Sequence, residues 1–300
     1  MPHVAINTSQ AEPPKESEIK KAIKLFSNGR ALGSNSIPAE IYKAWDPALL
    51  QKLTKLFQTM LQQEAIPQEL KDAAIVHIYK RKGNRQACDN HREISLLVIA
   101  GKILARVLLN RLNQHMEDGH LPESQCGFRE GRGIVDMIFG ACQLQEKWKE
   151  QNRDVYTTFV DLTKAFDTVS REGLWQIMGR FGCLGKSISM VRPFHNSMLA
   201  RVLGDGDSSD AFPATNGVKQ GLTPMLAPTL FSMMFSAMLS DAFCNDEETS
   251  IKIRYRTNGR LFNLQRLQTR PRLKRTLCVI SHFADDCTLN AVTEARCSRA

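Results

Sequence analysis

Residues 277–289 read Leu-Cys-Val-Ile-Ser-His-Phe-Ala-Asp-Asp-Cys-Thr-Leu, two β-rich runs joined at a pair of adjacent acids. This pattern predicts a hairpin with Asp285 and Asp286 at its tight turn. Adjacent acids at a turn are usually a solvated loop tip. Between apolar flanks, however, such a turn presents carboxylates from a rigid element, as the binding of a hard cation requires.

A third carboxylate ends another predicted strand. Residues 155–162 alternate in polarity, and Asp161 follows the apolar pair Phe159-Val160. If this strand neighbours the hairpin, the three aspartates could hold two Mg²⁺ ions about 4 Å apart, the geometry of two-metal phosphoryl transfer. Without cations the carboxylates would repel one another and raise each other's pKa, so the cluster favours a metal site.

A glycine-containing turn, Asn216-Gly217-Val218-Lys219-Gln220-Gly221, precedes a helix that we expect to start at Pro228. Its glycines let the backbone approach a ligand closely, and Gln220 offers both donors and acceptors. By itself this arrangement is common.

Composition narrows the class of protein. The chain has 300 residues, 42% of them hydrophobic, and a formal net charge of +9, which favours polyanionic partners. Its eight cysteines include no C-x-x-C pair and no zinc-like cluster, so we expect reduced thiols in an intracellular protein. The longest apolar stretch, 224–239, is too short to span a membrane, and no signal peptide is recognised, so we expect no membrane contact.

Hydrophobic periodicity predicts mixed helices and strands, hence an α/β or α+β fold. Residues 1–15 are expected to form a disordered tail. Helices are expected at 16–26, 38–44, 48–63, 100–116, 134–150 and 172–181 and after Pro228. Strands are expected at 73–79 and 155–162, with a hairpin near 203–207.

Three segments carry a resemblance to a known family. They are Phe159-x-Asp161-x-x-x-Ala165-Phe166-Asp167, Gly217-Val218-Lys219-Gln220-Gly221 and Phe283-Ala284-Asp285-Asp286. They resemble successive polymerase motifs of reverse transcriptases, in the right order. With the upstream segments 89–97 and 121–129, the chain is similar to the LINE-type, non-LTR retrotransposon enzymes.

The resemblance implies an α+β right-hand polymerase with fingers and a partial palm, lacking the thumb. A fingers-like region would span 16–132 and a truncated palm-like region 133–300, within a reverse transcriptase domain at about 60–300. Only 14 residues follow Asp286, so we expect a truncated or decayed copy.

The resemblance also implies roles for single residues. Asp161 and Asp285 would hold two Mg²⁺ ions (Mn²⁺ being an alternative), with Asp286 as electrostatic support or a weaker ligand. Phe166 would stack under the sugar and exclude a 2′-hydroxyl, although core packing is an alternative. Nucleotide-binding roles would fall to four further residues: Lys80, Arg92, Gln220 and Gly221. The alternative for Arg92 is a plain surface charge without a binding role.

The implied function is RNA-directed DNA polymerisation, with RNA template, DNA primer and dNTP as partners, in the nucleus or the cytoplasm. The chief alternative is a catalytically inactive nucleic-acid-binding remnant; a palm-like nucleotidyl cyclase is disfavoured by the 219–221 and Arg92 segments. Two departures from the family pattern stand out: Glu93 follows Arg92, and six residues, 222–227, separate Gly221 from Pro228 where four are usual. The basic run 251–275 would contact nucleic acid or form a solvated linker.

Overall fold

The computed structural model describes residues 12–29, 31–44, 46–117, 125, 127, 131–150, 152, 154, 156–204, 207–218, 226–243, 252–256, 273–277, 280–283 and 286–291. The chain divides into two compact units, residues 1–120 with 164–234 and residues 121–163 with 235–300. Each unit is assembled from separate stretches of chain. The fingers-like and palm-like segments, with their boundary at 132–133, stay a prediction.

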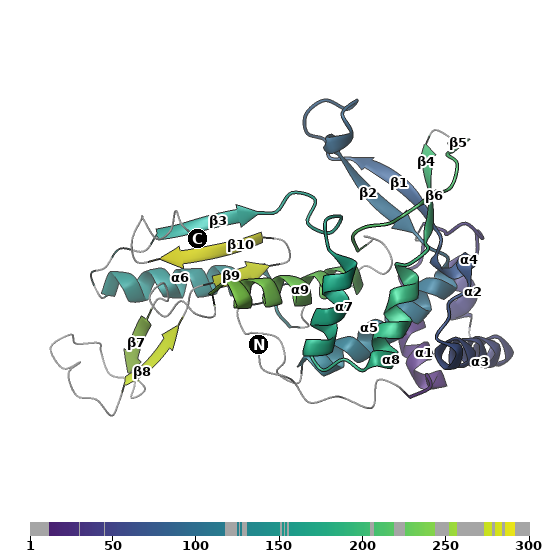
Figure 1. The fold of residues 1–300 in the computed structure, drawn as a ribbon, viewed down its shortest axis with the longest axis horizontal. Helices are drawn as coiled ribbons and strands as arrows, with labels where there is room; N and C mark the ends of the chain where they lie inside the picture. The colour runs from purple at the N-terminus through teal and green to yellow at the C-terminus, as the bar shows by residue number, and fades with distance from the viewer. Residues whose placement is uncertain are drawn as a thin grey trace. The chain divides into compact units, whose positions relative to one another are not determined.

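Helices make up most of the first unit (Figure 1). They are α1 (Glu16–Lys24), α2 (Ala39–Lys43), α3 (Pro47–Gln63), α4 (Gln68–Lys71), α5 (Ile99–Glu117), α7 (Arg171–Arg180) and α8 (Gly185–Val191), with short 3₁₀ turns at Cys88–Asn90 and Arg192–Phe194. The core forms around α5, where Ile103, Leu104 and Leu109 are completely buried. Because burial of apolar side chains is the main favourable term in folding, this helix organises the unit.

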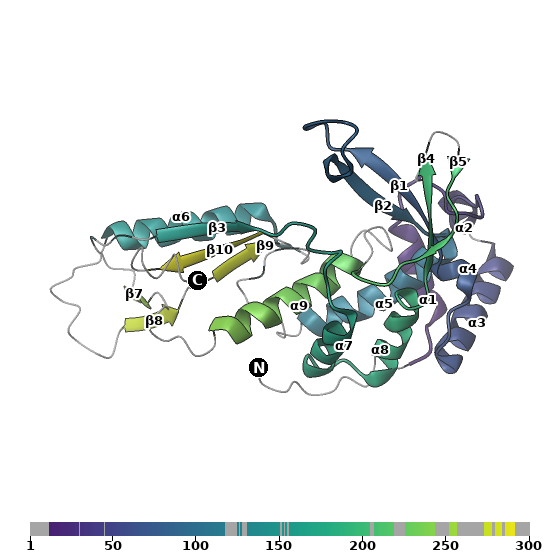
Figure 2. The same cartoon turned by 45° about the horizontal axis from the view of Figure 1, so that its top comes forward.

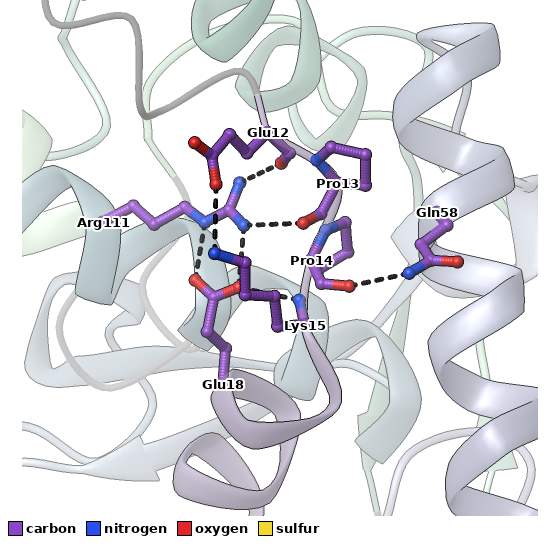
Figure 3. A network of polar contacts seen from close by, with 7 residues as sticks. All are labelled: Glu12, Pro13, Pro14, Lys15, Glu18, Gln58 and Arg111. Atoms are coloured by element: carbon purple, nitrogen blue, oxygen red, sulfur yellow. Dashed lines mark hydrogen bonds and ion pairs between the residues drawn. The ribbon is translucent and has the colours of Figure 1, made fainter.

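Arg111 of α5 binds the segment that leads into α1 (Figure 3). Its guanidinium donates two 2.8 Å hydrogen bonds to the Glu18 carboxylate and one of 2.6 Å to the Glu12 carbonyl. Gln58 of α3 donates to the Pro14 carbonyl at 3.0 Å. Side chains of α3 and α5 thus hold residues 12–15, and the disordered tail expected over 1–15 stays a prediction. Residues 1–11 of that tail lie outside the described residues.

A mixed sheet stands beside these helices. Its strands are β1 (Ala73–Tyr79), β2 (His91–Leu96), β4 (Leu199–Gly204), β5 (Asp207–Ser208) and β6 (Phe212–Pro213). β1 pairs antiparallel with β2 and parallel with β4, where Ala73 lies opposite Ala200. β5 and β6 both pair antiparallel with β4, so the predicted hairpin near 203–207 is confirmed.

The second unit contains a three-stranded sheet in the order β3–β10–β9 and the helix α6 (Ile134–Glu150). Its strands are β3 (Tyr156–Asp161), β9 (Ile280–Phe283) and β10 (Asp286–Ala291), all antiparallel to their neighbours. Both views show α6 running alongside this sheet (Figures 1 and 2). The hairpin predicted around the adjacent acids is confirmed, with Asp286 as the first residue of β10.

Two further elements refine the predictions. β7 (Lys252–Arg256) and β8 (Leu273–Leu277) pair antiparallel within the basic run, so at least these parts are not a linker, while 257–272 lie outside the described residues. α9 (Leu226–Phe243) starts two residues before Pro228, which its first turn accepts because no backbone donor is needed there. None of the described helices is long and apolar enough to cross a membrane.

Candidate active site

Two acidic residues face each other across β3 and β10. In the antiparallel register Asp161, the last residue of β3, lies opposite Asp286, the first residue of β10. Residues directly opposite each other point to the same face, with Cβ atoms about 4.5–5.5 Å apart. A hydrogen bond of 2.8 Å from Thr157 to Asn290, another opposed pair of these strands, agrees with this register. Both aspartates are exposed, and Asp285 lies outside the described residues.

A cavity of about 460 Å³ adjoins this pair. It is lined by residues of α6 and by residues of β3 and β10. The main lining side chains are Ile134, Ile138, Leu144, Phe159, Asp161 and Asp286. Asp161 and Asp286 are thus the two carboxylates in an otherwise mostly apolar lining. Such a cavity is typical of a ligand site, in which a few polar groups set specificity.

The donor chemistry of this pair fits Mg²⁺, which prefers carboxylate oxygens and usually takes one or two of them from a protein. Two like charges this close also favour a cation between them. Among the described residues no cluster of three or more Asp, Glu, His or Cys side chains could hold a metal ion. The predicted set needs Asp285 as its third member, so the two-metal site stays a prediction.

The pKa of the Cys287 thiol reflects both its burial and the charge of the neighbouring Asp286. The Cys287 side chain is buried, and burial raises the pKa of the thiol, with the negative charge of Asp286 raising it further. A protonated thiol is a poor nucleophile and a poor metal ligand. Asp161 and Asp286 are therefore the carboxylate groups available to a cation among the described residues that line the cavity.

Phe166 belongs to the first unit and is largely buried there. Its side chain is 8% exposed, and its ring lies 4.8 Å from that of Phe231 in α9. Phe166 therefore packs in the core of the first unit, as its alternative role predicts. A role as a gate against ribonucleotides, which needs one ring edge to reach the sugar, stays a prediction.

Lys80 and Arg92 lie on the hairpin of β1 and β2. Lys80 follows β1 directly, and its ammonium donates to the Asp89 carbonyl at 2.8 Å. Arg92 lies in β2 opposite Ile78, and both basic side chains are exposed. This placement suits either a triphosphate grip or a plain surface charge, so their roles stay predictions.

The same hairpin reaches the turn that carries Phe166. Lys164 forms an ion pair of 3.1 Å with Asp89, and Lys164 has a left-handed backbone with φ of 53°. The hydrogen bond to Asp89 raises the pKa of Lys164, and the nearby charges of Glu93 and Asp167 act in the same direction. Sequence reasoning missed Lys164 and Asp89, because no local signal links two residues so far apart in the chain.

The glycine turn before α9 packs directly on the Phe166 segment. Gly217 has φ of +72°, and a Cβ placed on it would come within 2.6 Å of the Asp167 Cα. The Val218 amide donates to the Phe166 carbonyl at 2.9 Å, and the Gly217 amide to the Val169 carbonyl at 3.3 Å. Glycine is therefore required here for both conformation and space. Gln220 and Gly221 lie outside the described residues.

The structure thus brings predicted residues together in two groups. Asp161 and Asp286 both line the cavity in the second unit. In the first unit, Lys80 and Phe166 are linked through Asp89 and Lys164, while Arg92 lies on the same hairpin. Carboxylates that could bind cations and basic side chains that could bind phosphate are groups that metal-dependent phosphoryl transfer uses.

The family described as "Reverse transcriptase (RNA-dependent DNA polymerase)" matches residues 78–300 of this chain. The chain belongs to the reverse transcriptase family. The match contains Asp161, Asp286 and the turn at Gly217. The predicted α+β class, with polymerase fingers and palm, is confirmed, and so is the resemblance to non-LTR retrotransposon enzymes.

Curated relatives of this reverse transcriptase domain come from mobile elements. The "RNA-directed DNA polymerase from mobile element jockey" of Drosophila melanogaster is 29% identical over 227 residues, 74% of this chain and 24% of the relative. The "Retrovirus-related Pol polyprotein from type-2 retrotransposable element R2DM" of the same species is 27% identical over 179 residues, 58% of this chain and 16% of the relative. The chain thus spans a quarter or less of the length of these relatives.

Among solved structures, the apo telomerase of Candida tropicalis, truncated from its C-terminal domain, is similar with a TM-score of 0.49 and 12% identity. The likeness covers 90% of this chain and 53% of the telomerase chain.

Proposed function

We propose that this reverse transcriptase domain extends a DNA primer on an RNA template, using dNTPs and divalent cations. The observation that carries the proposal is the register of β3 and β10 in a chain of this family. This register sets Asp161 opposite Asp286, and both residues line a cavity. Reverse transcriptases generally use divalent metal ions. For this chain we propose two Mg²⁺ ions, with Mn²⁺ as a substitute, working in the nucleus or the cytoplasm.

In the proposed reaction, the 3′-hydroxyl of the primer gives up its proton to solvent, and its oxygen attacks the α-phosphorus of the dNTP. A new P–O bond forms, the bond between the α-phosphorus and the bridging oxygen breaks, and pyrophosphate leaves with that electron pair. Asp161, Asp285 and Asp286 would hold the cations. When bound, two such ions lower the pKa of the attacking hydroxyl and stabilise the charge on the leaving group.

The remaining residues would bind and orient the nucleotide. Lys80 and Arg92, both exposed on the β1–β2 hairpin, would neutralise the triphosphate, whose negative charge grows toward the transition state. Phe166 would bound the sugar, and Gln220 with Gly221 would line the nucleotide and template pocket. The +9 net charge of the chain suits two nucleic acid partners.

The test is primer extension on poly(rA)/oligo(dT) with dTTP and Mg²⁺. Asp161→Asn should lower the rate at least about 10²-fold, because it removes a group whose charge is needed for several kcal/mol of transition-state stabilisation. Asp210→Asn is the matched control, since Asp210 is exposed and belongs to the first unit, whereas the carboxylate pair belongs to the second. It should extend the primer as the unsubstituted chain does.

Two results would contradict the proposal. Equal extension by Asp161→Asn and the unsubstituted chain would remove Asp161 from the reaction. A folded chain that extends no primer, yet binds RNA in a salt-sensitive way without regard to Mg²⁺, would favour an inactive nucleic-acid-binding remnant.

A further inference from the structure

Arg171, the first residue of α7, makes an unusual set of hydrogen bonds. Its guanidinium donates to three main-chain carbonyls, Gly217 at 2.9 Å, Asn216 at 3.1 Å and His195 at 2.5 Å. The side chain is half-buried, and burial lowers the pKa of the guanidinium, although an arginine stays charged at neutral pH. The rigid fork of arginine suits several fixed acceptors, whereas a lysine ammonium would reach fewer of them.

Two of these carbonyls belong to the glycine turn that covers the Phe166 segment. The turn is held from one side by Arg171 and from the other by the bonds of Gly217 and Val218 to main-chain carbonyls at 166 and 169. Val218 is also completely buried. The backbone around Phe166 is therefore fixed through main-chain contacts that end on one guanidinium.

The third carbonyl ties this assembly to the helical core. His195 is completely buried, its Nδ1 lies 3.1 Å from the Val191 carbonyl, and its ring lies 5.7 Å from that of Trp175 in α7. Arg171 thus joins three elements: the start of α7, the turn after α8 and the glycine turn. All three hydrogen bonds go to main-chain carbonyls, so Arg171 fixes the position of the backbone and does not act on other side chains.

We infer that Arg171 is a positioning residue for nucleotide selection. It holds the turn at 216–218 against the backbone at 166–169, which fixes the position from which Phe166 would bound the sugar. This inference rests on the proposed function, because it needs Phe166 to bound the sugar. Arg171 itself contacts no nucleotide in this scheme.

The expected effect follows from the precision that sugar discrimination requires. A misplacement of 1 Å in such a site costs about 10²-fold in rate, and a bound dNTP differs from an NTP by one hydroxyl. If the turn loosens, Phe166 can withdraw and admit the 2′-hydroxyl. The substitution should therefore change the choice between nucleotides more than it changes the use of dTTP.

The experiment measures kcat/KM for dTTP and for UTP on poly(rA)/oligo(dT), using the full chain. Arg171→Lys keeps the charge, and Arg171→Gln keeps one donor group, so at least one of them should fold. Arg180→Gln is the matched control, because Arg180 is an exposed arginine at the other end of α7. Phe166→Ala serves as the reference for complete loss of the gate. Thermal midpoints are recorded for all variants.

Arg171→Lys should lower the ratio of dTTP to UTP efficiency at least about tenfold, toward the value of Phe166→Ala, while Arg180→Gln keeps the ratio of the unsubstituted chain. A loss of stability alone would slow both nucleotides equally. If the unsubstituted chain and Arg171→Lys discriminate equally, the inference fails while the proposed function stands. If the unsubstituted chain extends nothing with either nucleotide, the proposed function fails and the inference falls with it.

Discussion

Replacing Gly217 with alanine tests the close packing of the glycine turn on the Phe166 segment. A new Cβ would lie 2.6 Å from the Asp167 Cα and 2.7 Å from the Phe166 carbonyl oxygen, both main-chain atoms that cannot turn aside. Forcing an extra carbon into such a contact costs about 1–3 kcal/mol. The left-handed conformation adds about 1–2 kcal/mol for alanine, partly offset by the smaller entropy of the unfolded chain.

Gly29→Ala isolates the contact from the conformation. Gly29 lies in the same unit and has φ of +66°, but nothing lies within 4 Å of the position of its Cβ. The conformational and entropic contributions are thus nearly the same in both variants, and they cancel in the comparison. The remaining difference, about 1–3 kcal/mol of unfolding free energy, measures the steric contact alone.

Thermal unfolding followed by far-UV circular dichroism is a sufficient assay. For a unit of this size each kcal/mol shifts the midpoint by about 2–4 °C, so Gly217→Ala should melt about 2–12 °C below Gly29→Ala. Midpoints that agree within about 1 °C would refute the close approach of Gly217 to Asp167. They would also remove the steric basis for a fixed Phe166.

Two further predictions concern ionisable groups. Burial opposes ionisation of Glu18, but the hydrogen bonds from Arg111 and the Lys15 amide outweigh it and lower the pKa of Glu18 below 4.5. The resulting stabilisation of the fold is therefore complete above pH 4.5 and is lost as the pH falls through the lowered pKa. In urea titrations Glu18→Gln should therefore be less stable than the unsubstituted chain at pH 7 and approach it below pH 4.5, and a difference independent of pH would contradict the pair. Iodoacetamide at pH 8 should label the exposed Cys88 and Cys142 at least about tenfold faster than the buried Cys183, since burial raises the pKa of that thiol to about 12. Peptide mass spectrometry would read this out, and equal labelling would show that Cys183 is accessible.

Local patterns predicted the local structure well. The strand Ala73–Tyr79 and the helix Ile134–Glu150 have the bounds expected from alternation and from helical spacing. The pairing of the Asp161 strand with the Asp286 hairpin also meets the condition on which the predicted aspartate cluster depends. These features depend on residues that are near in sequence or that carry a strong motif.

Side-chain contacts between distant segments could not be predicted. The ion pair of Lys164 with Asp89 and the bonds of Arg171 to the glycine turn join polar residues that look like ordinary surface charges in the sequence. Phe166 illustrates the same limit, since a motif suggested a gate while packing against Phe231 also makes it a core residue. Only the folded chain shows which backbone carbonyls a single arginine can reach.

The parallel pairing of β1 with β4 has a consequence for biosynthesis. Residues 73–76 of β1 find their partners at 200–203, so more than a hundred residues must leave the ribosome before this pair can form. At translation rates of about 5–20 residues per second, one edge of β1 waits on the order of ten seconds. An unpaired strand edge is a template for association with other chains, and pairing of β1 with β2 covers only the opposite edge, so this edge stays open until β4 has been made. Slower codons placed after residue 204 would give β4 time to dock before the second unit is complete.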